Sequence, residues 1–292
     1  MLLQDARQRI AHARQSGATE LSLSLSDLSG MPYSRWEMTN LEVIGLWHEH
    51  LMTLLGELAY LPALTTLKLS DNGLRALPLE VPNLTGLTAL DLSGNDMSTI
   101  PPEIANLTNL TTLDISGNDL TSLPPELADL TGLTELRLNS NYVQNALSAM
   151  LKEIIRLTGL TTLSLAGNEI TTFPAEILAL TNLTNLDLSQ NGLSRLGPDI
   201  ATLCDLTTLK LAGNRLETFP PEIAQLTNLA TLDLSANDLE TLPPEIATLP
   251  SLKTLKLRDN DLETLPPEIS LLSNLQTLDL RANGVSALPP EI

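Results

Sequence analysis

Cysteine is almost absent from this chain of 292 residues, in which Cys204 is the only one. A chain that makes no use of disulfides is typical of a reducing compartment, so the sequence predicts a cytoplasmic protein. Cys204 lies between Leu203 and Asp205 with no histidine nearby in the sequence, which argues against a thiol enzyme. Aromatic residues are scarce too, at 2% against a hydrophobic fraction of 42%, and this predicts an aliphatic core.

Basic residues are outnumbered, and the formal net charge is −19. An acidic chain repels phosphate groups, which argues against nucleic-acid binding and against docking on anionic membranes. No apolar run approaches the roughly 20 residues that cross a bilayer, and residues 1–9 lack the apolar region of a signal peptide. The sequence therefore predicts neither a nucleic-acid partner nor insertion into a membrane.

The motifs that carry most enzyme chemistry are missing as well. There is no glycine-rich phosphate loop, no Gly-Lys-Ser/Thr, no nucleophile elbow and no cysteine–histidine metal spacing. His48 and His50, on either side of Glu49, invite interpretation as a metal site. Metal sites usually have longer-range ligands, however, and His12 is the only further histidine. The sequence predicts no catalytic residue, no cofactor and no metal.

The dominant feature that is present is an internal repeat. The stretch from Leu110 to Leu130 recurs along nearly the whole chain, with the frame Leu-x-x-Leu-x-Leu-x-x-Asn-x-Leu in each copy. Copies lie 23 residues apart, except for one step of 27, and their asparagines are Asn72, Asn95, Asn118, Asn141, Asn168, Asn191, Asn214, Asn237, Asn260 and Asn283. Two earlier positions at the same spacing, Glu49 and Ser26, keep the apolar frame without the asparagine. This frame and period are the signature of the leucine-rich repeat, an α/β solenoid.

Each copy predicts one short strand followed by an irregular return. Apolar and polar residues alternate around Asp114, which is the period of a half-buried strand. Stacked copies then predict a horseshoe whose concave face is a parallel sheet of about twelve strands. The Pro-Pro-Glu after Leu123 favours an extended or 3-10 convex side over full helices. The asparagines are expected inside, bonded to main-chain groups of the bends, as a structural ladder rather than a binding site.

Three segments depart from this rhythm. Residues 2–15 have the apolar stripe of an amphipathic helix, so residues 1–17 are predicted to cap a single repeat domain that spans 18–292. Residues 145–157 have apolar positions at helical spacing and Asn145 as a candidate N-cap, which predicts one helical copy. This helix is either a docking surface or a tolerated insertion. The chain stops at Ile292 inside a copy, which predicts that it is part of a longer protein.

The concave face is expected to carry both signs of charge. One side chain per frame, between its second and third leucines, points there, and these are Ser22, Gly45, Lys68, Asp91, Asp114, Arg137, Ser164, Asp187, Lys210, Asp233, Lys256 and Asp279. Opposite charges on neighbouring strands are expected to pair. Protein interfaces favour aromatic and arginine anchors, and the predicted partner contacts are Trp47, His48, Glu135, Arg137, Asn139, Tyr142, Lys256, Arg258 and Arg281. The aromatic cluster of Trp36 and Trp47 could instead pack against the N-terminal helix.

The repeat text L-T-x-L-T-x-L-D-L-S-x-N-x-L-x-x-L-P-P-E-I over residues 18–292 resembles the intracellular repeats of Ras-group and Scribble-type scaffold proteins. The opening, a helix and then Ser-Gly-Ala-Thr-Glu-Leu at 16–21, resembles the N-terminus of bacterial Roco proteins. In that family the repeats precede a Roc GTPase domain and a COR dimerisation domain. This sequence has neither, so no GTPase residue is carried over.

These resemblances imply a non-enzymatic protein–protein interaction module, the sensing or regulatory arm of a larger signalling protein. Its partners would then include the Roc and COR domains of the same parent protein. The alternative is a free-standing scaffold or a secreted bacterial effector that binds a host protein through the repeat surface.

Overall fold

The structure is a computed structural model that describes residues 15, 19–24, 42–47, 63–143 and 146–290. The chain forms two compact units, Met1–Arg137 and Leu138–Ile292. The predicted cap at 1–17 lies outside the described residues apart from Gln15, as do Trp36, the His48–His50 segment and Asn145. The division into a cap and one repeat domain therefore stays a prediction.

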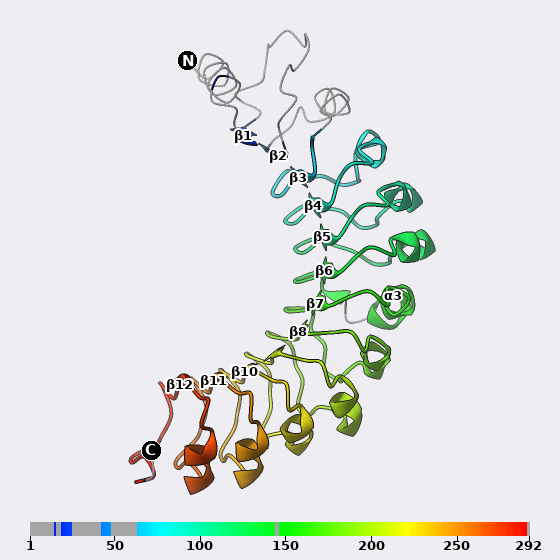
Figure 1. The fold of residues 1–292 in the computed structure, drawn as a ribbon. Helices are drawn as coiled ribbons and strands as arrows, with labels where there is room; N and C mark the ends of the chain where they lie inside the picture. Colours follow the sequence, from blue (N-terminus) through cyan, green and yellow to red (C-terminus); the bar gives the residue numbers. More distant parts are fainter. Residues whose placement is uncertain (1–14, 16–18, 25–41, 48–62, 144–145, 291–292) are drawn as a thin grey trace. The chain divides into compact units, whose positions relative to one another are not determined.

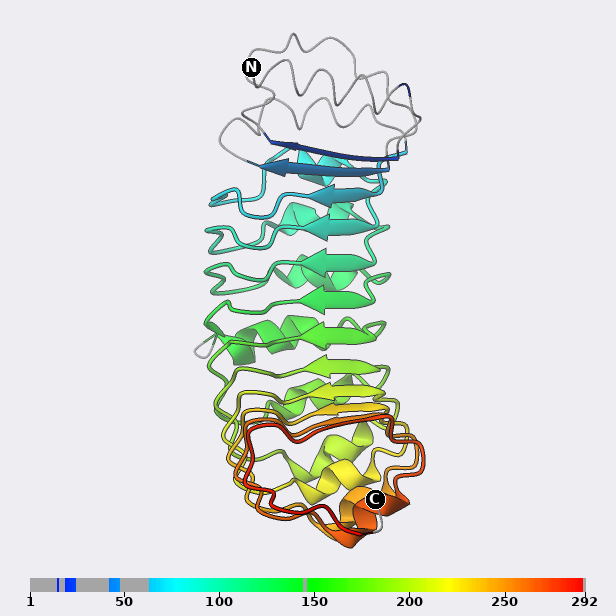
Figure 2. The ribbon, with the colours of Figure 1, turned by 90° about the vertical axis from the view of Figure 1, so that its left-hand side faces the viewer.

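Each unit contains one series of parallel strands that pair in chain order (Figures 1 and 2). In the first unit the strands are β1 (Glu20–Ser24), β2 (Val43–Trp47), β3 (Thr66–Lys68), β4 (Ala89–Asp91), β5 (Thr112–Asp114) and β6 (Glu135–Arg137). In the second unit they are β7 (Thr162–Ser164), β8 (Asn185–Asp187), β9 (Thr208–Lys210), β10 (Thr231–Asp233), β11 (Thr254–Lys256) and β12 (Thr277–Asp279). Equivalent frame positions face each other across neighbouring strands, as Leu209 faces Leu232.

The predicted leucine-rich-repeat fold with a parallel sheet is confirmed for the strands β3–β12. The predicted total of about twelve strands depends on β1 and β2, of which little beyond the main chain is described, and it stays a prediction. Within each copy the leucines on either side of the central strand residue point inward, and Leu209 and Leu211 are both 0% exposed. Alternation along the strand places the residue between them, Lys210, on the opposite face.

The return path of most copies is a short 3-10 helix on the side of the core opposite the strands (Figure 1). These helices are η2 (Val81–Asn83), η3 (Pro102–Asn106), η4 (Pro125–Asp129), η6 (Ala175–Ala179), η7 (Pro198–Thr202), η8 (Pro221–Gln225), η9 (Pro244–Thr248) and η10 (Pro267–Leu271). Proline stands at one of the first two positions of most of them, where its fixed φ suits a helical turn and its missing N–H removes no bond. Each helix buries an aliphatic side chain, which is Val81 in η2 and an isoleucine or leucine in the others, such as Ile200 of η7, so the return path also fills the core.

One copy in the second unit replaces the 3-10 turn with an α-helix, α3 (Leu147–Ile154), as the sequence predicts. Leu147, Met150, Leu151 and Ile154 are buried, because their spacing places them on one face of the helix. The N-cap of α3 is Ala146, and no side chain caps the helix by a hydrogen bond. The predicted N-cap, Asn145, lies outside the described residues, and the structure places the N-cap at the following residue.

Most of the frame asparagines bond main-chain groups of their own turn and of the neighbouring one. Asn214, which is 7% exposed, is a typical member. Its Oδ1 accepts a hydrogen bond from Leu193 N at 3.0 Å, and its Nδ2 donates to Leu188 O at 3.0 Å and Leu211 O at 2.9 Å. These three groups sit where the strands end and the chain bends, so strand ladders do not satisfy them.

The residue before each of these asparagines adopts a left-handed backbone. Four copies place glycine there, but six do not, and Ala236 has φ 52°. An alanine in this conformation is strained by roughly 1–2 kcal/mol because its Cβ crowds the following carbonyl.

Replacing Ala236 by glycine is expected to raise the free energy of unfolding by about 1 kcal/mol, since the strain disappears. Urea denaturation measures this change. The matched control is Ala212→Gly, at a nearby position without positive φ, where the same substitution should lower the free energy of unfolding by about 0.5–1 kcal/mol. Equal effects at the two positions would contradict the strain at Ala236.

Candidate protein-binding surface

The strands of each unit present one outward side chain between two buried leucines, on a surface that we call the sheet face. In the first unit the members of this central row whose exposure is described are Lys68, Asp91, Asp114 and Arg137. In the second unit they are Ser164, Asp187, Lys210, Asp233, Lys256 and Asp279. From Asp187 onward the sign of the charge alternates from strand to strand, so neighbours can neutralise one another.

The expected pairing of opposite charges across strands is confirmed for Lys210 and Lys256, whereas Lys68 pairs with Glu20 and not with Asp91 of the next strand. Lys210 Nζ lies 3.2 Å from Asp187 Oδ2, and Lys256 Nζ lies 3.2 Å from Asp233 Oδ2. The Ser235 main-chain N–H also donates to Asp233 Oδ1 at 3.1 Å, which fixes the carboxylate beside its lysine. The lysine side chains are about half exposed, at 49% and 46%, so each pair contributes at most about 1 kcal/mol.

Three predicted contact residues of the second unit, Lys256, Arg258 and Arg281, come together on β11, β12 and the bends that follow them. Arg258 and Arg281 hold the same frame position in adjacent copies, and their side chains are 51% and 72% exposed. Arg281 binds Asp279 through two hydrogen bonds, of 2.8 Å from Nε and 2.6 Å from Nη2. Arg258 Nε lies 3.0 Å from Asp259 Oδ2. Every cation of this cluster is therefore in an ion pair, but none is buried.

The carboxyl group of Asp279 has a pKa lowered from 3.8 to about 2, chiefly because Arg281 donates side-chain hydrogen bonds to the ionised form. The Arg281 main-chain N–H and the positive charges of Arg281 and Arg258 act in the same direction. A pKa lowered by folding means that the ion pair stabilises the chain fully above pH 4 or so, and that this stabilisation is lost as the pH falls towards 2.

NMR titration of the Asp279 carboxyl carbon is expected to give a midpoint near pH 2. Replacing Arg281 by glutamine should move the midpoint up towards 3.8, the ordinary value, because the largest cause of the shift is removed. Arg258→Gln should move it less, since Arg258 acts through its charge alone. A midpoint that does not respond to Arg281→Gln would show that another group lowers this pKa.

The other predicted contacts are divided between the units. In the first unit Arg137 on β6 pairs with Glu135, Nη2 to Oε1 at 2.5 Å, and with Asp114 at 3.7 Å. In the second unit Asn139 is engaged internally, because its Oδ1 accepts hydrogen bonds from Ser164 Oγ at 2.5 Å and Ala166 N at 3.0 Å. Tyr142 is 66% exposed.

Trp47 ends β2, and its side chain is not among the described parts of the structure. His48 lies outside the described residues.

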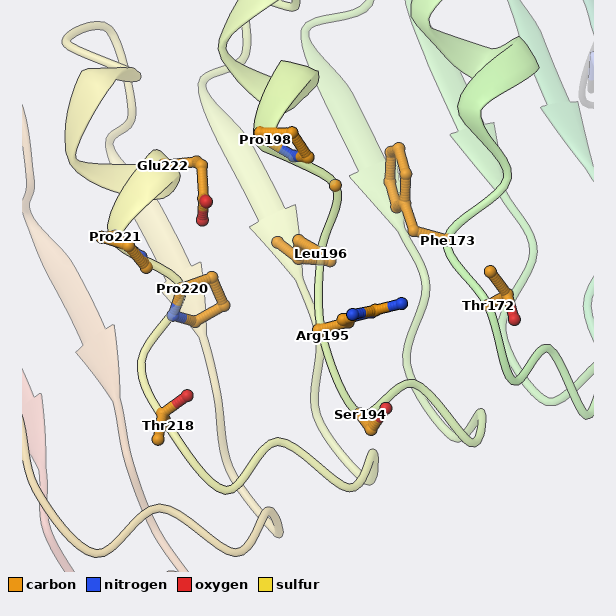
Figure 3. Close-up of a pocket in the computed structure, with 11 residues that line it drawn as sticks. Thr172, Phe173, Ser194, Arg195, Leu196, Pro198, Thr218, Pro220, Pro221 and Glu222 are labelled. Atoms are coloured by element: carbon orange, nitrogen blue, oxygen red, sulfur yellow. The ribbon is translucent and has the colours of Figure 1, made fainter.

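A groove of about 600 Å³ in the second unit was not predicted from the sequence. Three successive copies line it, with Thr172, Phe173, Ser194, Arg195, Leu196, Gly197, Pro198, Thr218, Pro220, Pro221 and Glu222 (Figure 3). It lies where the chain runs from a strand to the following 3-10 helix. The sequence signal was the text Leu196-Gly-Pro, in which Gly197 takes the place of the first proline of Leu-Pro-Pro. The Leu-Gly-Pro text shows that a proline ring is missing, but it does not show which residues of the neighbouring copies line the groove.

Chemistry-bearing side chains do not cluster elsewhere in the described chain. Among the described residues no three His, Cys, Asp or Glu side chains lie close enough to hold a metal ion. Cys204 is an exposed free thiol. In the ranges that the structure covers, no helix has the length and hydropathy needed to cross a membrane.

Stacked parallel strands, inward leucines and asparagines bonded within the bends define a leucine-rich-repeat protein. Comparison with family models agrees. The leucine-rich-repeat model matches residues 62–120, 85–143, 181–239, 204–262 and 227–285, and a two-copy leucine-rich-repeat model matches 158–202. The matched segments cover well over half of the chain, which therefore belongs to the leucine-rich-repeat family.

Solved structures of other repeat proteins are similar to this chain. Internalin C2 of Listeria monocytogenes is 28% identical with a TM-score of 0.58, over 68% of this chain and 82% of that one. The plant peptide hormone receptor RGFR1, solved in complex with RGF2, is 27% identical with a TM-score of 0.58, over 93% of this chain and 48% of that one. The internalin InlF of the same bacterium, at 22% identity and a TM-score of 0.61 over 98% of this chain and 90% of that one, shares the fold. The comparison with curated proteins gave no match.

Proposed function

We propose that the chain is a non-enzymatic protein-interaction module, which binds its partner on the sheet face of the second unit around Lys256, Arg258 and Arg281. The observation that carries this proposal is the pair of arginines at one frame position of adjacent copies, both more than half exposed. Arginine is among the residues that most often dominate the energy of protein interfaces.

The ion pairs of this cluster do not prevent binding. An exposed ion pair contributes about 0–1 kcal/mol, so a partner carboxylate can replace Asp259 or Asp279 at little expense. Bidentate arginine–carboxylate contacts are stronger in the drier environment of an interface, which favours the exchange. The expected partner surface is therefore acidic at its centre. RGFR1, a structural relative, was solved with RGF2 bound, which supports a binding role for this fold.

The remaining predicted contacts, Trp47, His48, Glu135, Arg137, Asn139 and Tyr142, stay proposals within their own units. Arg137 and Tyr142 have the exposure that a contact residue needs. The internal bonds of Asn139 to Ser164 and Ala166 favour a structural role for its side chain.

We also propose that the module is the repeat arm of a larger cytoplasmic signalling protein of the Roco type, with its Roc and COR domains among the partners. The support is the sequence resemblance at 16–21 and the single, unpaired cysteine. The second candidate is a free-standing binding protein. Its support is the similarity to internalin C2, a repeat protein of Listeria monocytogenes that is 28% identical to this chain.

Photo-cross-linking in the source cells tests the sheet-face proposal. A photoreactive amino acid at Thr277, exposed on β12, is expected to capture a protein partner, and Arg258→Glu with Arg281→Glu should abolish the adduct. The same photoreactive residue at Ser270, exposed on η10, is the control for the opposite side of the unit. Capture from Ser270 alone, or an adduct that survives the double charge reversal, would contradict the proposal.

Mass spectrometry of the endogenous protein separates the two candidates. Peptides beyond Ile292 that include a Gly-x-x-x-x-Gly-Lys-Ser/Thr loop would support the Roco-type arm. An endogenous chain that ends at or just after residue 292 would favour the free-standing binding protein.

A further inference from the structure

The groove of the second unit lies beside Gly197, where one proline ring is missing from the row that runs from Pro174 to Pro289. Equivalent positions in other copies hold Pro124, Pro220 and Pro243. Gly197 keeps their backbone, with φ −77° and ψ 150° against −72° and 143° at Pro124. A Cβ at Gly197 would meet only Phe173 Cδ1, at an ordinary 3.6 Å. The space that a proline ring would fill at this position is therefore open. The backbone of Gly197 nevertheless has the φ and ψ of a proline.

Apolar rings and a leucine form much of the lining of this space. Phe173 is 8% exposed and Leu196 is 6% exposed, so their buried sides belong to the core while one edge of each faces the groove. Pro198, Pro220 and Pro221 complete the apolar lining. Aromatic and proline-lined grooves of this kind bind extended proline-containing segments, because such segments lose little conformational entropy when they dock.

The polar groups at the groove also depart from the repeat. Arg195 stands where the flanking copies have Thr172 and Thr218, and its exposed side chain has no ion-pair partner among the described residues. Gly197 supplies a main-chain N–H that proline lacks, and within the described chain no acceptor binds it. Figure 3 shows Arg195 extending towards the copy that carries Phe173, whereas Glu222 lies on the side of Pro220 and Pro221.

We propose that this groove is a second docking site, for an extended segment of another protein that inserts a proline ring beside Gly197 and places a carboxylate on Arg195. The ring of the ligand would restore the missing member of the proline row, in contact with Phe173 and Leu196. A carbonyl of the segment would accept the free Gly197 N–H. The guanidinium of Arg195, which has no ion-pair partner among the described residues, is the group that positions the carboxylate at this groove.

This site is independent of the sheet face, and the test keeps the two apart. A phage-displayed library of random twelve-residue peptides is selected on the whole chain, and the recovered peptides are measured by fluorescence anisotropy. Two variants restore the residues of the other copies, Gly197→Pro and Arg195→Thr. Gly197→Pro fits the existing φ and should keep or raise the unfolding temperature, so loss of binding would not reflect loss of the fold. Arg215→Thr removes the same charge at an exposed position that does not line the groove.

The selected peptides are expected to share a proline next to Asp or Glu, and to bind at least tenfold more weakly to Gly197→Pro and to Arg195→Thr. Arg215→Thr and the Arg258→Glu, Arg281→Glu pair should leave their affinity within twofold. The proposal is overturned if no peptide is enriched, if the enriched peptides lack proline or are basic, or if they bind Gly197→Pro as tightly as the parent chain. The sheet-face variants report on the proposed function alone, so either proposal can fail without the other.

Discussion

Replacing Asn214 by alanine is expected to lower the free energy of unfolding by about 3–5 kcal/mol. The substitution removes three hydrogen bonds, from Leu193 N and to Leu188 O and Leu211 O. These main-chain groups have no strand partner, and Asn214 itself is only 7% exposed, so water reaches them poorly. Each buried polar group left without a partner costs roughly 1–3 kcal/mol.

Urea denaturation followed by far-ultraviolet circular dichroism measures the loss, with an exposed asparagine as the control. Asn228 donates one hydrogen bond, from Nδ2 to Cys204 O at 2.9 Å, and is exposed. Asn228→Ala should therefore lower the free energy of unfolding by about 1 kcal/mol or less, because water replaces the lost bond. Similar losses of unfolding free energy at the two positions would show that burial of the Asn214 amide does not increase its contribution to stability.

A second variant separates hydrogen bonding from packing. Asn214→Asp preserves the volume and the acceptor for Leu193 N but replaces the amide donor by an oxygen that faces the carbonyls of Leu188 and Leu211. It should destabilise the chain at neutral pH about as much as the alanine variant does. If Asn214→Asp is instead as stable as the parent, the donors do not matter and the loss in alanine is a cavity effect.

The repeated parts of this fold were predictable because every copy has the same spacing of apolar residues. The spacing of leucines around each strand fixed which residues are buried, and Leu209 and Leu211 lie in the core as alternation requires. The helix α3 was predictable for the same reason, since its apolar residues recur at helical spacing. Such patterns depend only on local periodicity, which a sequence displays directly.

Features that depend on contacts between neighbouring copies were harder to predict from the sequence. Alternation predicted the pairs of lysine and aspartate across strands, but not that Arg258 binds Asp259 within its own bend. The start of α3 at Leu147, after Ala146 as its N-cap, was not predicted, because side-chain capping preference is a weak guide to where a helix begins. Predicting the groove would have required the positions of Phe173 and Pro220, which lie one copy before and one copy after Gly197. Their side chains line the space beside Gly197, and the sequence alone does not show this.

The second large effect on the free energy of unfolding is expected when a core leucine is replaced by alanine. Two leucines that occupy the same position of the repeat, but with different burial, allow a comparison. Leu209 on β9 is 0% exposed and faces Leu186 and Leu232 on its two neighbouring strands. Leu278 on β12 faces Leu255 on one side, and its side chain is only partly buried. In a solenoid each copy is stabilised chiefly by its neighbours, so the same deletion should have unequal effects at the two positions.

Leu209→Ala is expected to lower the free energy of unfolding by about 3–4 kcal/mol, and Leu278→Ala by about 1–2 kcal/mol. At Leu209 the lost methyl groups leave a cavity enclosed by two copies, whereas at Leu278 solvent and side-chain motion fill much of the space. Urea midpoints at an unchanged denaturant slope measure both losses. Equal losses would mean that the stability of each copy is intrinsic. A larger loss at Leu209 than at Leu278 would instead show that the stability comes mainly from the interfaces between copies, to which the hydrogen bonds of Asn214 also contribute.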